Sequence, residues 1–414
     1  MVTYDLIVIG GGAAGFFGAI QAASMKPGLS VLILEKSSKL LGKVRVSGGG
    51  RCNVTHHCFN QSKLAQHYPR GEKALKSMFK EFAAEEIVEW FRSKDVNLKT
   101  ESDGRMFPVT DRSETIIGCF LREAERLRIT ISMNAPVSSI NKDGQLLSVL
   151  TNAKERYVAT RVLVAVGGHP SVDAYQWLVA MGHSLRKPIP SLFTFNNSGK
   201  AFTDLMGISV PDATVRIAGT RFSEQGPLLI THWGLSGPCV IKLSAWAAEY
   251  LHSVNYQFTV MVNWLGNTGE EELRKILTTL KVEKGKSKIT SNPMFNLPGR
   301  LWQRLCTFSE IEDTKIWNEV SMRSINKLIE HLIRCPFEIK GKTTFKEEFV
   351  TCGGIDLRDV NLETMESKVF RNVYFAGEVL DIDGETGGFN FQAAWTTAFI
   401  AAKSITHSTD RLNN

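Results

Sequence analysis

The sequence predicts an α/β fold, in which a Rossmann-like dinucleotide-binding domain is interrupted by an inserted small β-barrel or compact sheet and a small helical subdomain. Three observations lead to this prediction. A glycine motif lies between two strand-like runs near the N-terminus, and two further strand-to-glycine edges occur near residues 167 and 377. The middle of the chain has β-type and then helical patterns without a phosphate-binding loop of its own.

The N-terminal segment has the pattern of a strand, a glycine turn, a helix and a second strand. Two apolar runs flank the G-x-G-x-x-G pattern at Gly10–Gly15, and Glu35 closes the second run. In such a unit Gly10 permits a tight turn, Gly12 lets the backbone approach a pyrophosphate, and Gly15 lets helix and strand pack closely. The acid can accept hydrogen bonds from ribose hydroxyls, so we expect a dinucleotide at this turn.

The segment Leu6–Met25 carries no charge, but glycines interrupt it and no basic region precedes it. It therefore does not have the pattern of a membrane helix or a signal peptide, and no other segment has 18 consecutive apolar residues. We expect a soluble, cytoplasmic protein. The seven cysteines form no C-x-x-C pair, which favours a reducing compartment and indicates neither disulfides nor a metal site.

The chain has 414 residues, enough for two or three domains, and a formal net charge of +7. A charge of this size suits a phosphorylated cofactor or an anionic substrate. Because lysine and arginine are spread along the chain, the charge does not by itself indicate nucleic-acid binding.

The two further glycine edges indicate which dinucleotide is bound. Arg161–Val166 is a buried-strand pattern that ends in Gly167 and Gly168, after hairpin-like strands at 137–140, 146–150 and 157–159. Near the C-terminus, a strand pattern over 372–375 is followed by Gly377 and Glu378, and Gly387-Gly388 leads into a helical stretch over 391–405. A site that needs both ends of the chain is typical of FAD, which stretches across the sheet. The last helix would direct its positive end at a group that becomes negative, such as reduced flavin.

Several motifs give the chain a resemblance to a known family. These are Gly42-Lys43 with Ser47–Thr55, Gly104–Pro108, Thr231–Pro238, Thr364–Lys368 and Phe375–Gly384. Together they resemble bacterial NAD(P)/FAD-dependent oxidoreductases of the two-dinucleotide-binding, glutathione-reductase type. Relatives in this family include aminoacetone oxidase and flavoproteins implicated in bile-acid dehydroxylation, and they carry an inserted β-barrel plus a helical domain.

The resemblance implies a non-covalent FAD cofactor and a set of residues that contact it. These residues are Gly10, Gly12, Ala13, Ala14, Gly15, Glu35, Lys36, Gly42, Lys43, Ser47, Gly48, Gly49, Gly50, Arg51, Cys52, Asn53, Val137, Ala165, Val166, Gly167, Gly168, Gly377, Glu378, Asp381, Gly387, Gly388, Phe389, Asn390 and Gln392. Two departures from the family pattern, His169–Ala174 after the second glycine edge and Cys352 before Gly353, are expected to reshape the substrate side of the flavin.

The predicted domains follow from these patterns. Residues 1–190 and 345–414 form the FAD domain, 191–263 and 335–344 the barrel, and 264–334 the helical subdomain. Thr268–Glu271 has the pattern of a capping box that opens a helix, and residues 325–333 have helical spacing. Glu283–Lys288 resembles the end of a P-loop, but the required glycine is replaced by Leu280, so we interpret it as a solvated loop.

Three residues are candidates for catalysis. His232 is the candidate acid or base, with loop bracing as the alternative. Arg51 and Asn53 are expected either to anchor substrate or to brace the glycine-rich loop. Cys52 is expected to be a small buried residue, and His56 and His57 ordinary loop residues. Glu378 and Asp381 are expected to hydrogen-bond the ribityl chain, since the flavin supplies the chemistry.

The favoured function is an FAD-dependent oxidoreductase that transfers hydride between flavin and a small organic molecule held between the FAD domain and the inserted domain. No second G-x-G-x-x-G unit is present, so a nicotinamide that reduces the flavin would bind only transiently in the substrate cavity. The alternative is that an organic substrate supplies the hydride and the electrons pass to oxygen or another acceptor. No nucleic-acid or membrane partner is expected. The alternatives are an RNA-modifying or RNA-binding flavoprotein, and a non-catalytic flavin-binding module.

Overall fold

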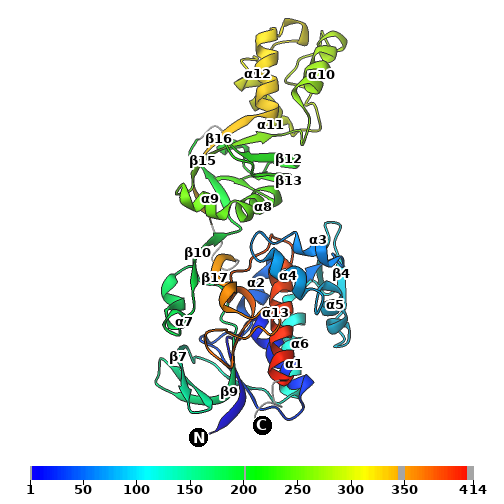
Figure 1. Ribbon diagram of the computed structural model, residues 1–414. Helices are drawn as coiled ribbons and strands as arrows, with labels where there is room; N and C mark the ends of the chain where they lie inside the picture. The colour runs from blue at the N-terminus through cyan, green and yellow to red at the C-terminus, as the bar shows by residue number, and fades with distance from the viewer. Residues whose placement is uncertain (1, 200–201, 344–349, 408–414) are drawn as a thin grey trace. The chain divides into compact units, whose positions relative to one another are not determined.

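The structure, a computed structural model, describes residues 2–199, 202–343 and 350–407 and contains two compact units (Figure 1). The first unit comprises Met1–Ser191 and Lys346–Asn414, and the second comprises Leu192–Phe345. The second unit is therefore an insertion into the first. The sequence predicts the corresponding boundaries at 190/191 and 344/345, and the second of these lies outside the described residues.

The first unit is built on a seven-stranded sheet with the order β6-β2-β1-β9-β8-β7, in which β18 also pairs with β9. Its strands are β1 (Thr3–Ile9), β2 (Val31–Leu34), β6 (Thr130–Ser132), β7 (Val137–Asp143), β8 (Leu146–Thr151), β9 (Arg156–Val164) and β18 (Val373–Phe375). The sequence suggests separate strands over 157–159 and 161–166, but β9 is a single strand that ends before Ala165.

The parallel strands of this sheet end at one edge. Ile9, at the end of β1, pairs with Leu34 of β2 and Val164 of β9, and Val164 pairs with Phe375 of β18. The segments that follow these strands must therefore meet at the carboxyl edge of the sheet, where open α/β sheets bind their ligands.

Two buried helices from opposite ends of the chain pack together beside the sheet (Figure 1). They are α1 (Ala13–Met25) and α13 (Phe389–His407), and the second begins two residues earlier than the sequence pattern suggests. A Cβ atom at Gly18 of α1 would lie 2.6 Å from Leu163 Cδ2, so this glycine lets α1 approach β9. None of the described helices has the length and apolar character needed to cross a bilayer.

The other elements of the first unit are shorter. The helices are α2 (Gly42–Gly50), α3 (Gln61–Ala65), α4 (Glu72–Met78), α5 (Ala84–Arg92), α6 (Ser113–Arg126) and α7 (Gln176–Ala180). A three-stranded sheet has the order β3-β5-β4, with β3 (Thr55–His56), β4 (Leu98–Thr100) and β5 (Arg105–Pro108). Two antiparallel strands, β10 (Leu185–Ser191) and β17 (Val350–Ile355), lie where the chain leaves and re-enters the unit.

The second unit contains a closed barrel with the order β11-β14-β13-β12-β15-β16. Its strands are β11 (Thr194–Asn197), β12 (Ser209–Ile217), β13 (Ser223–Ile230), β14 (Gly234–Ser236), β15 (Gln257–Asn263) and β16 (Cys335–Thr343), accompanied by α8 (Pro238–Trp246) and α9 (Ala248–Ser253). The fold class predicted from the sequence is confirmed.

Three helices form the remainder of the second unit, α10 (Glu270–Glu283), α11 (Gly299–Phe308) and α12 (Met322–Ile333). The apolar positions at helical spacing on α10 and α12 are buried in a common core, Leu273, Leu277, Leu280, Ile325, Leu328 and Leu332. The expected capping box is wrong: α10 has Gly269 as its N-cap, and the Thr268 hydroxyl donates instead to the Leu265 carbonyl at 2.9 Å.

His183 is a buried histidine whose ionisation should affect the stability of the first unit. Its Nδ1 donates to the Leu178 carbonyl (3.1 Å), and its Nε2 lies 2.7 Å from the Ser367 hydroxyl, an arrangement that suits a neutral ring. Burial lowers the pKa of His183 below its usual value of 6.5. The unfolded chain therefore takes up a proton first as the pH falls, and stability present above about pH 6.5 is lost below it.

Urea unfolding measures this effect at pH 7.5 and 5.5. The free energy of unfolding should decrease less between these pH values in His183→Gln than in the parent protein. Equal decreases would contradict this role.

Candidate functional site

The turn between β1 and α1 contains two glycines that the fold requires and a third that leaves space for a ligand. A Cβ at Gly10 (φ +113°) would lie 2.3 Å from the Ala165 carbonyl oxygen, and one at Gly15 would lie 1.9 Å from the Gly10 oxygen. At Gly12, φ is −93° and no atom lies within 4 Å of the added Cβ. Open space therefore lies in front of the N-terminus of the 13-residue helix α1, where N–H groups and the helix dipole favour a phosphate.

Glu35 is fixed beside this turn by three hydrogen bonds. Its Oε2 accepts from the Gly11 N–H (2.7 Å), and its Oε1 accepts from the N–H (2.9 Å) and hydroxyl (2.8 Å) of Ser37. The carboxylate is almost fully buried and is oriented before any ligand arrives. Sequence reasoning missed Ser37, because nothing in the motif specifies the partner that orients the acid.

A cavity of about 630 Å³ opens beside the turn, a size typical of small-molecule sites. Its lining includes the predicted residues Gly10, Glu35, Lys36, Val137, Val166 and Gly167. Residues that sequence reasoning missed complete the wall, among them Asn152, Tyr175, Gln176 and Trp177. The departure segment His169–Ala174 contributes His169, Asp173 and Ala174, so its unusual sequence was a signal that this segment borders the site.

A second part of the site joins four distant segments around Glu378. Its Oε1 accepts from the Thr351 N–H (2.9 Å), and its Oε2 pairs with Lys43 Nζ (2.6 Å). A Cβ at Gly168 would lie 2.4 Å from Thr351 Oγ1 and 2.6 Å from Glu378 Oε1, so a larger residue there would displace these two side chains. The structure therefore brings the predicted residues Lys43, Gly168 and Glu378 together, with Thr351 as a partner that the sequence did not reveal.

The glycine-rich segment before Arg51 is partly helical, where the sequence suggested a loop. The helix α2 includes it, but Ser47 (φ −59°, ψ 146°) breaks the helical geometry, and Gly48 and Gly49 have φ of +59° and +69°. Cys52 follows at φ +64°, fully buried, and burial raises the pKa of its thiol to about 12. A buried, protonated thiol is unreactive, in agreement with its expected packing role.

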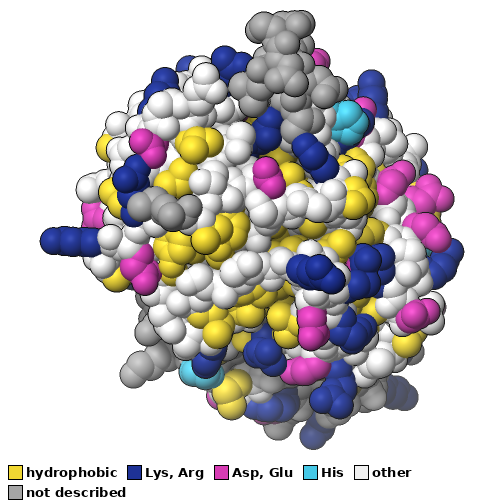
Figure 2. All heavy atoms as spheres, turned by 90° about the horizontal axis from the view of Figure 1, so that it is seen from below, with side chains coloured by type: hydrophobic (Ala, Val, Ile, Leu, Met, Phe, Trp, Pro, Cys, Tyr) yellow, Lys and Arg dark blue, Asp and Glu magenta, His cyan; other side chains and the backbone are white. Residues whose placement is uncertain are grey.

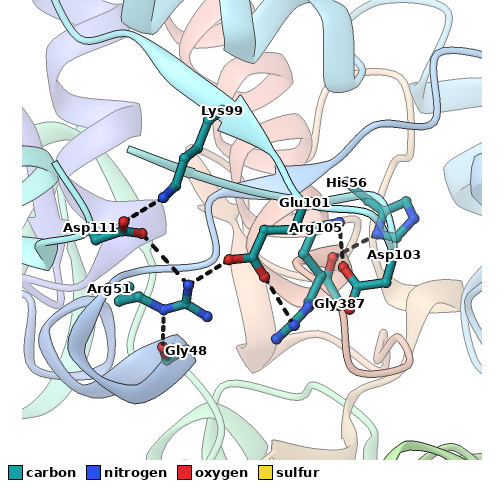
Figure 3. Close-up of polar contacts among 9 residues, drawn as sticks. All are labelled: Gly48, Arg51, His56, Lys99, Glu101, Asp103, Arg105, Asp111 and Gly387. Atoms are coloured by element: carbon teal, nitrogen blue, oxygen red, sulfur yellow. Dashed lines mark hydrogen bonds and ion pairs between the residues drawn. The ribbon is translucent and has the colours of Figure 1, made fainter. Parts of the chain in front are cut away.

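Arg51 is held by a charged network that comes from β4, β5 and the segment after them (Figure 3). Its guanidinium donates to Glu101 Oε1 (2.6 Å), lies 3.6 Å from Asp111 Oδ1, and stacks 4.0 Å above the Phe107 ring. Glu101 also pairs with Arg105 (3.1 Å). These contacts favour the bracing role for Arg51, and its proposed substrate contact stays a prediction.

Asn53 links the glycine-rich segment to the start of α13. In the orientation that satisfies both ends of its amide, it donates to the Thr55 carbonyl (3.1 Å) and accepts from the Gly388 N–H (2.9 Å). Gln392, one turn into α13, is fully buried and accepts from the Thr55 hydroxyl (2.6 Å). Both amides therefore position the α13 N-terminus, and a direct contact with a cofactor stays a prediction for each.

Two histidines stack on Phe389, the first residue of α13. The ring centroids of His56 and His67 lie 4.7 Å and 4.2 Å from that of Phe389. His56 Nδ1 is 3.1 Å from the Gly387 carbonyl, and His67 Nδ1 is 3.2 Å from Glu385 Oε2. His67 and Glu385 were not predicted, because no motif marks them and only the fold brings them together.

Asp381 lies in a partly buried acidic cluster with an unusual ionisation. Burial, followed by the charge of Asp383, raises the pKa of Asp381 to about 6, although Arg70 and Arg186 oppose this shift. The unfolded chain loses this proton near pH 4, so the folded state loses stability as the pH rises from about 4 to 6.

Asp381→Asn removes this ionisation without changing the size of the side chain. We expect it to raise the free energy of unfolding at pH 7 by up to about 3 kcal/mol, since each pKa unit corresponds to about 1.4 kcal/mol. The gain should vanish near pH 4. Urea denaturation of flavin-free protein at both pH values measures it, and an equal gain at both would contradict the assignment.

His232 belongs to the second unit, where it is exposed in the turn between β13 and β14. Its ring packs edge-on against Trp233 with the ring centroids 4.1 Å apart. No hydrogen bond engages the imidazole within the described part of the chain. Its assignment as an acid or base stays a prediction.

The residues of the first unit fit FAD. The open space at Gly12 suits a pyrophosphate, Glu35 is oriented for a ribose, and the Glu378 cluster joins the second and third glycine edges. Predicted residues from both ends of the chain thus border one carboxyl edge of the sheet.

Comparison with known proteins agrees with this geometry. The family model described as HI0933-like protein Rossmann domain matches residues 4–404. A ribosomal RNA dihydrouridine synthase from Haemophilus influenzae is 29% identical over 96% of this chain and 98% of its own length. A 3-dehydro-bile acid delta(4,6)-reductase from Clostridium scindens is 26% identical over 96% and 98%. The structure of 3-ketosteroid delta1-dehydrogenase from Sterolibacterium denitrificans shares the fold at 14% identity, with a TM-score of 0.53 over 98% of this chain and all of that one.

Proposed function

We propose that this chain, which belongs to the HI0933-like Rossmann family of FAD-dependent oxidoreductases, reduces a carbon–carbon double bond conjugated to a carbonyl group. We further propose that the double bond is that of uracil in ribosomal RNA. One observation carries the proposal: two relatives with different substrates, each matched over nearly the whole chain, have names that denote the same chemistry.

The shared chemistry is addition of a hydride and a proton across a polarised double bond. Dihydrouridine differs from uridine by two hydrogens on the bond next to the C4 carbonyl, and a delta(4,6) reduction of a 3-oxo steroid acts on a conjugated dienone. FAD, when bound, supplies the hydride to the electron-poor carbon. The protein then has to bind the cofactor, orient the carbonyl compound and provide the proton.

Residues of this chain support each of these tasks. The space at Gly12 and the start of α1 would hold the pyrophosphate, and Glu35 the ribose. The N-terminus of α13, positioned by Asn53, would stabilise negative charge on reduced flavin. His232 remains the candidate proton donor. If NAD(P)H is the electron donor, it would bind transiently, since the sequence has no second G-x-G-x-x-G unit.

The choice of RNA over a small molecule revises the expectation drawn from the sequence. The RNA-modifying relative matches at slightly higher identity than the bile-acid reductase, 29% against 26%. The net charge of +7 is compatible with a polyanionic substrate. A small enone is the second candidate, favoured by the bile-acid reductase alone.

The test uses the purified protein with NADH or NADPH and ribosomal RNA transcribed in vitro, which contains no dihydrouridine. Nucleoside mass spectrometry should detect dihydrouridine, and its mass should increase when the nicotinamide carries deuterium at its transferable position or the buffer is D₂O. No dihydrouridine, together with turnover of a 3-oxo-4-ene steroid, would assign the same chemistry to a small substrate. Turnover of neither would overturn the proposed reaction.

A further inference from the structure

The loop between α10 and α11 carries lysines that the FAD site does not use. Residues 284–309 contain five basic residues and no acidic one. Lys284, Lys286 and Lys288 are its first three cations, and we call these three the lysine loop. All three side chains are exposed.

The lysines differ in this respect from five of the nine other cations in residues 264–334, which form ion pairs. Arg274 and Arg334 both pair with Glu270, at 2.9 Å and 2.6 Å, and Lys327 pairs with Glu310. By contrast, no member of the lysine loop forms an ion pair with any described residue. Exposed Glu283 and Glu319 flank the loop, but neither contacts its lysines through an ion pair.

The backbone of the lysine loop is held in place by hydrogen bonds to residues 316–318. The Trp317 N–H donates to the Ser287 carbonyl (3.1 Å), and the Asn318 N–H donates to the Gly285 carbonyl (3.0 Å). Lys288 also forms a β-bridge with Ile316. Gly285 is buried, and a Cβ there would lie 2.5 Å from the Asn318 amide.

A loop with a fixed backbone and three lysines that form no ion pair with the described residues suits a chain of phosphates; Lys284 Nζ donates only to the Met294 sulfur, at 3.9 Å. Lysines that contact phosphates release condensed counterions, which supplies sequence-independent affinity for nucleic acid. Because the loop is already ordered, binding costs less conformational entropy than it would for a flexible tail. On the face drawn in Figure 2, by comparison, basic side chains are interspersed with acidic ones.

We propose that the lysine loop binds the phosphate backbone of the RNA substrate, as a positioning surface within the second unit. This inference rests on the proposed function and adds to it the part of the chain that holds the RNA. Phosphate contacts set register and orientation without reading sequence, so the loop is expected to contribute affinity and salt dependence.

The test measures binding of a fluorescent ribosomal RNA fragment to the full-length, FAD-loaded protein over about 50–300 mM salt. The variant Lys284→Gln/Lys286→Gln/Lys288→Gln should bind at least about tenfold more weakly at low salt. The slope of log Kd against the logarithm of the salt concentration should be smaller by about 2, as expected for three lost phosphate contacts. The control Lys80→Gln/Lys154→Gln/Lys368→Gln makes the same charge change with scattered exposed lysines of the first unit and should keep the parent slope.

The outcomes separate the two proposals. If the parent protein forms dihydrouridine but the loop variant keeps its affinity and slope, the lysine loop proposal is overturned and the proposed function stands. If the parent protein neither binds RNA nor forms dihydrouridine, the proposed function is overturned, and the lysine loop proposal that rests on it is overturned as well. Binding of the parent to anionic vesicles but not to RNA would also overturn the RNA assignment. Unchanged flavin absorbance and circular dichroism establish that a variant is folded. If the triple variant does not fold, the single variant Lys286→Glu is measured in its place and should also bind RNA more weakly than the parent protein.

Discussion

Gly12→Val is expected to yield a folded protein without flavin. The added Cβ meets no protein atom within 4 Å and φ is −93°, so a side chain at Gly12 is compatible with the fold. It would instead fill the space from which a pyrophosphate reaches the N–H groups of α1. Purified Gly12→Val should be colourless, and its unfolding midpoint should match that of the flavin-free parent protein.

Gly15→Val is the matched contrast, since it makes the same substitution in the same turn. Here the Cβ would lie 1.9 Å from the Gly10 oxygen, a distance that the backbone cannot accept without moving. We expect this variant to be insoluble or unfolded. Gly12→Val with full flavin occupancy would show that the pyrophosphate lies elsewhere, and a well-folded Gly15→Val would contradict the described turn.

Arg70→Met is expected to destabilise the first unit by about 3–5 kcal/mol, because it leaves a buried carboxylate without its partner. Arg70 Nε donates to Asp383 Oδ1 (2.6 Å), and the Ser191 hydroxyl donates to Asp383 Oδ2 (2.8 Å). Asp383 is fully buried, and burial outweighs the attraction of Arg70, so its pKa is raised. Urea denaturation at pH 7 measures the loss.

The double variant Arg70→Met/Asp383→Leu is the control. It removes both charges and should recover much of the lost stability, since apolar replacements of a buried ion pair are often tolerated. In the single variant the pKa of Asp383 should rise further, so the defect should be smaller at pH 5 than at pH 8. Additive losses in the double variant, or a defect independent of pH, would show that Arg70 does not neutralise Asp383.

The sequence predicted the parts of the site that depend on local patterns. The turn at Gly10–Gly15 and the acid Glu35 are encoded within one βαβ unit, so their spacing was sufficient to predict them. The edges at Gly167 and Gly377 follow strands whose apolar runs mark their ends. Convergence of these edges then follows from the general rule for parallel sheets.

Partners chosen by tertiary structure were not predictable in the same way. Glu101 is distant in sequence from Arg51, and Thr351 from Glu378, so only the folded chain brings each pair together. The capping box failed for a local reason, because the Thr268 hydroxyl found a backbone acceptor at Leu265 instead.

Both ends of the chain are expected to build one non-covalent FAD site in the first unit. Acid precipitation of the purified yellow protein tests this, with chromatography and mass spectrometry of the supernatant. FAD is expected in the supernatant at close to one per chain, with a colourless pellet. FMN in the supernatant, colour retained by the pellet, or a protein that neither carries nor binds FAD would contradict it.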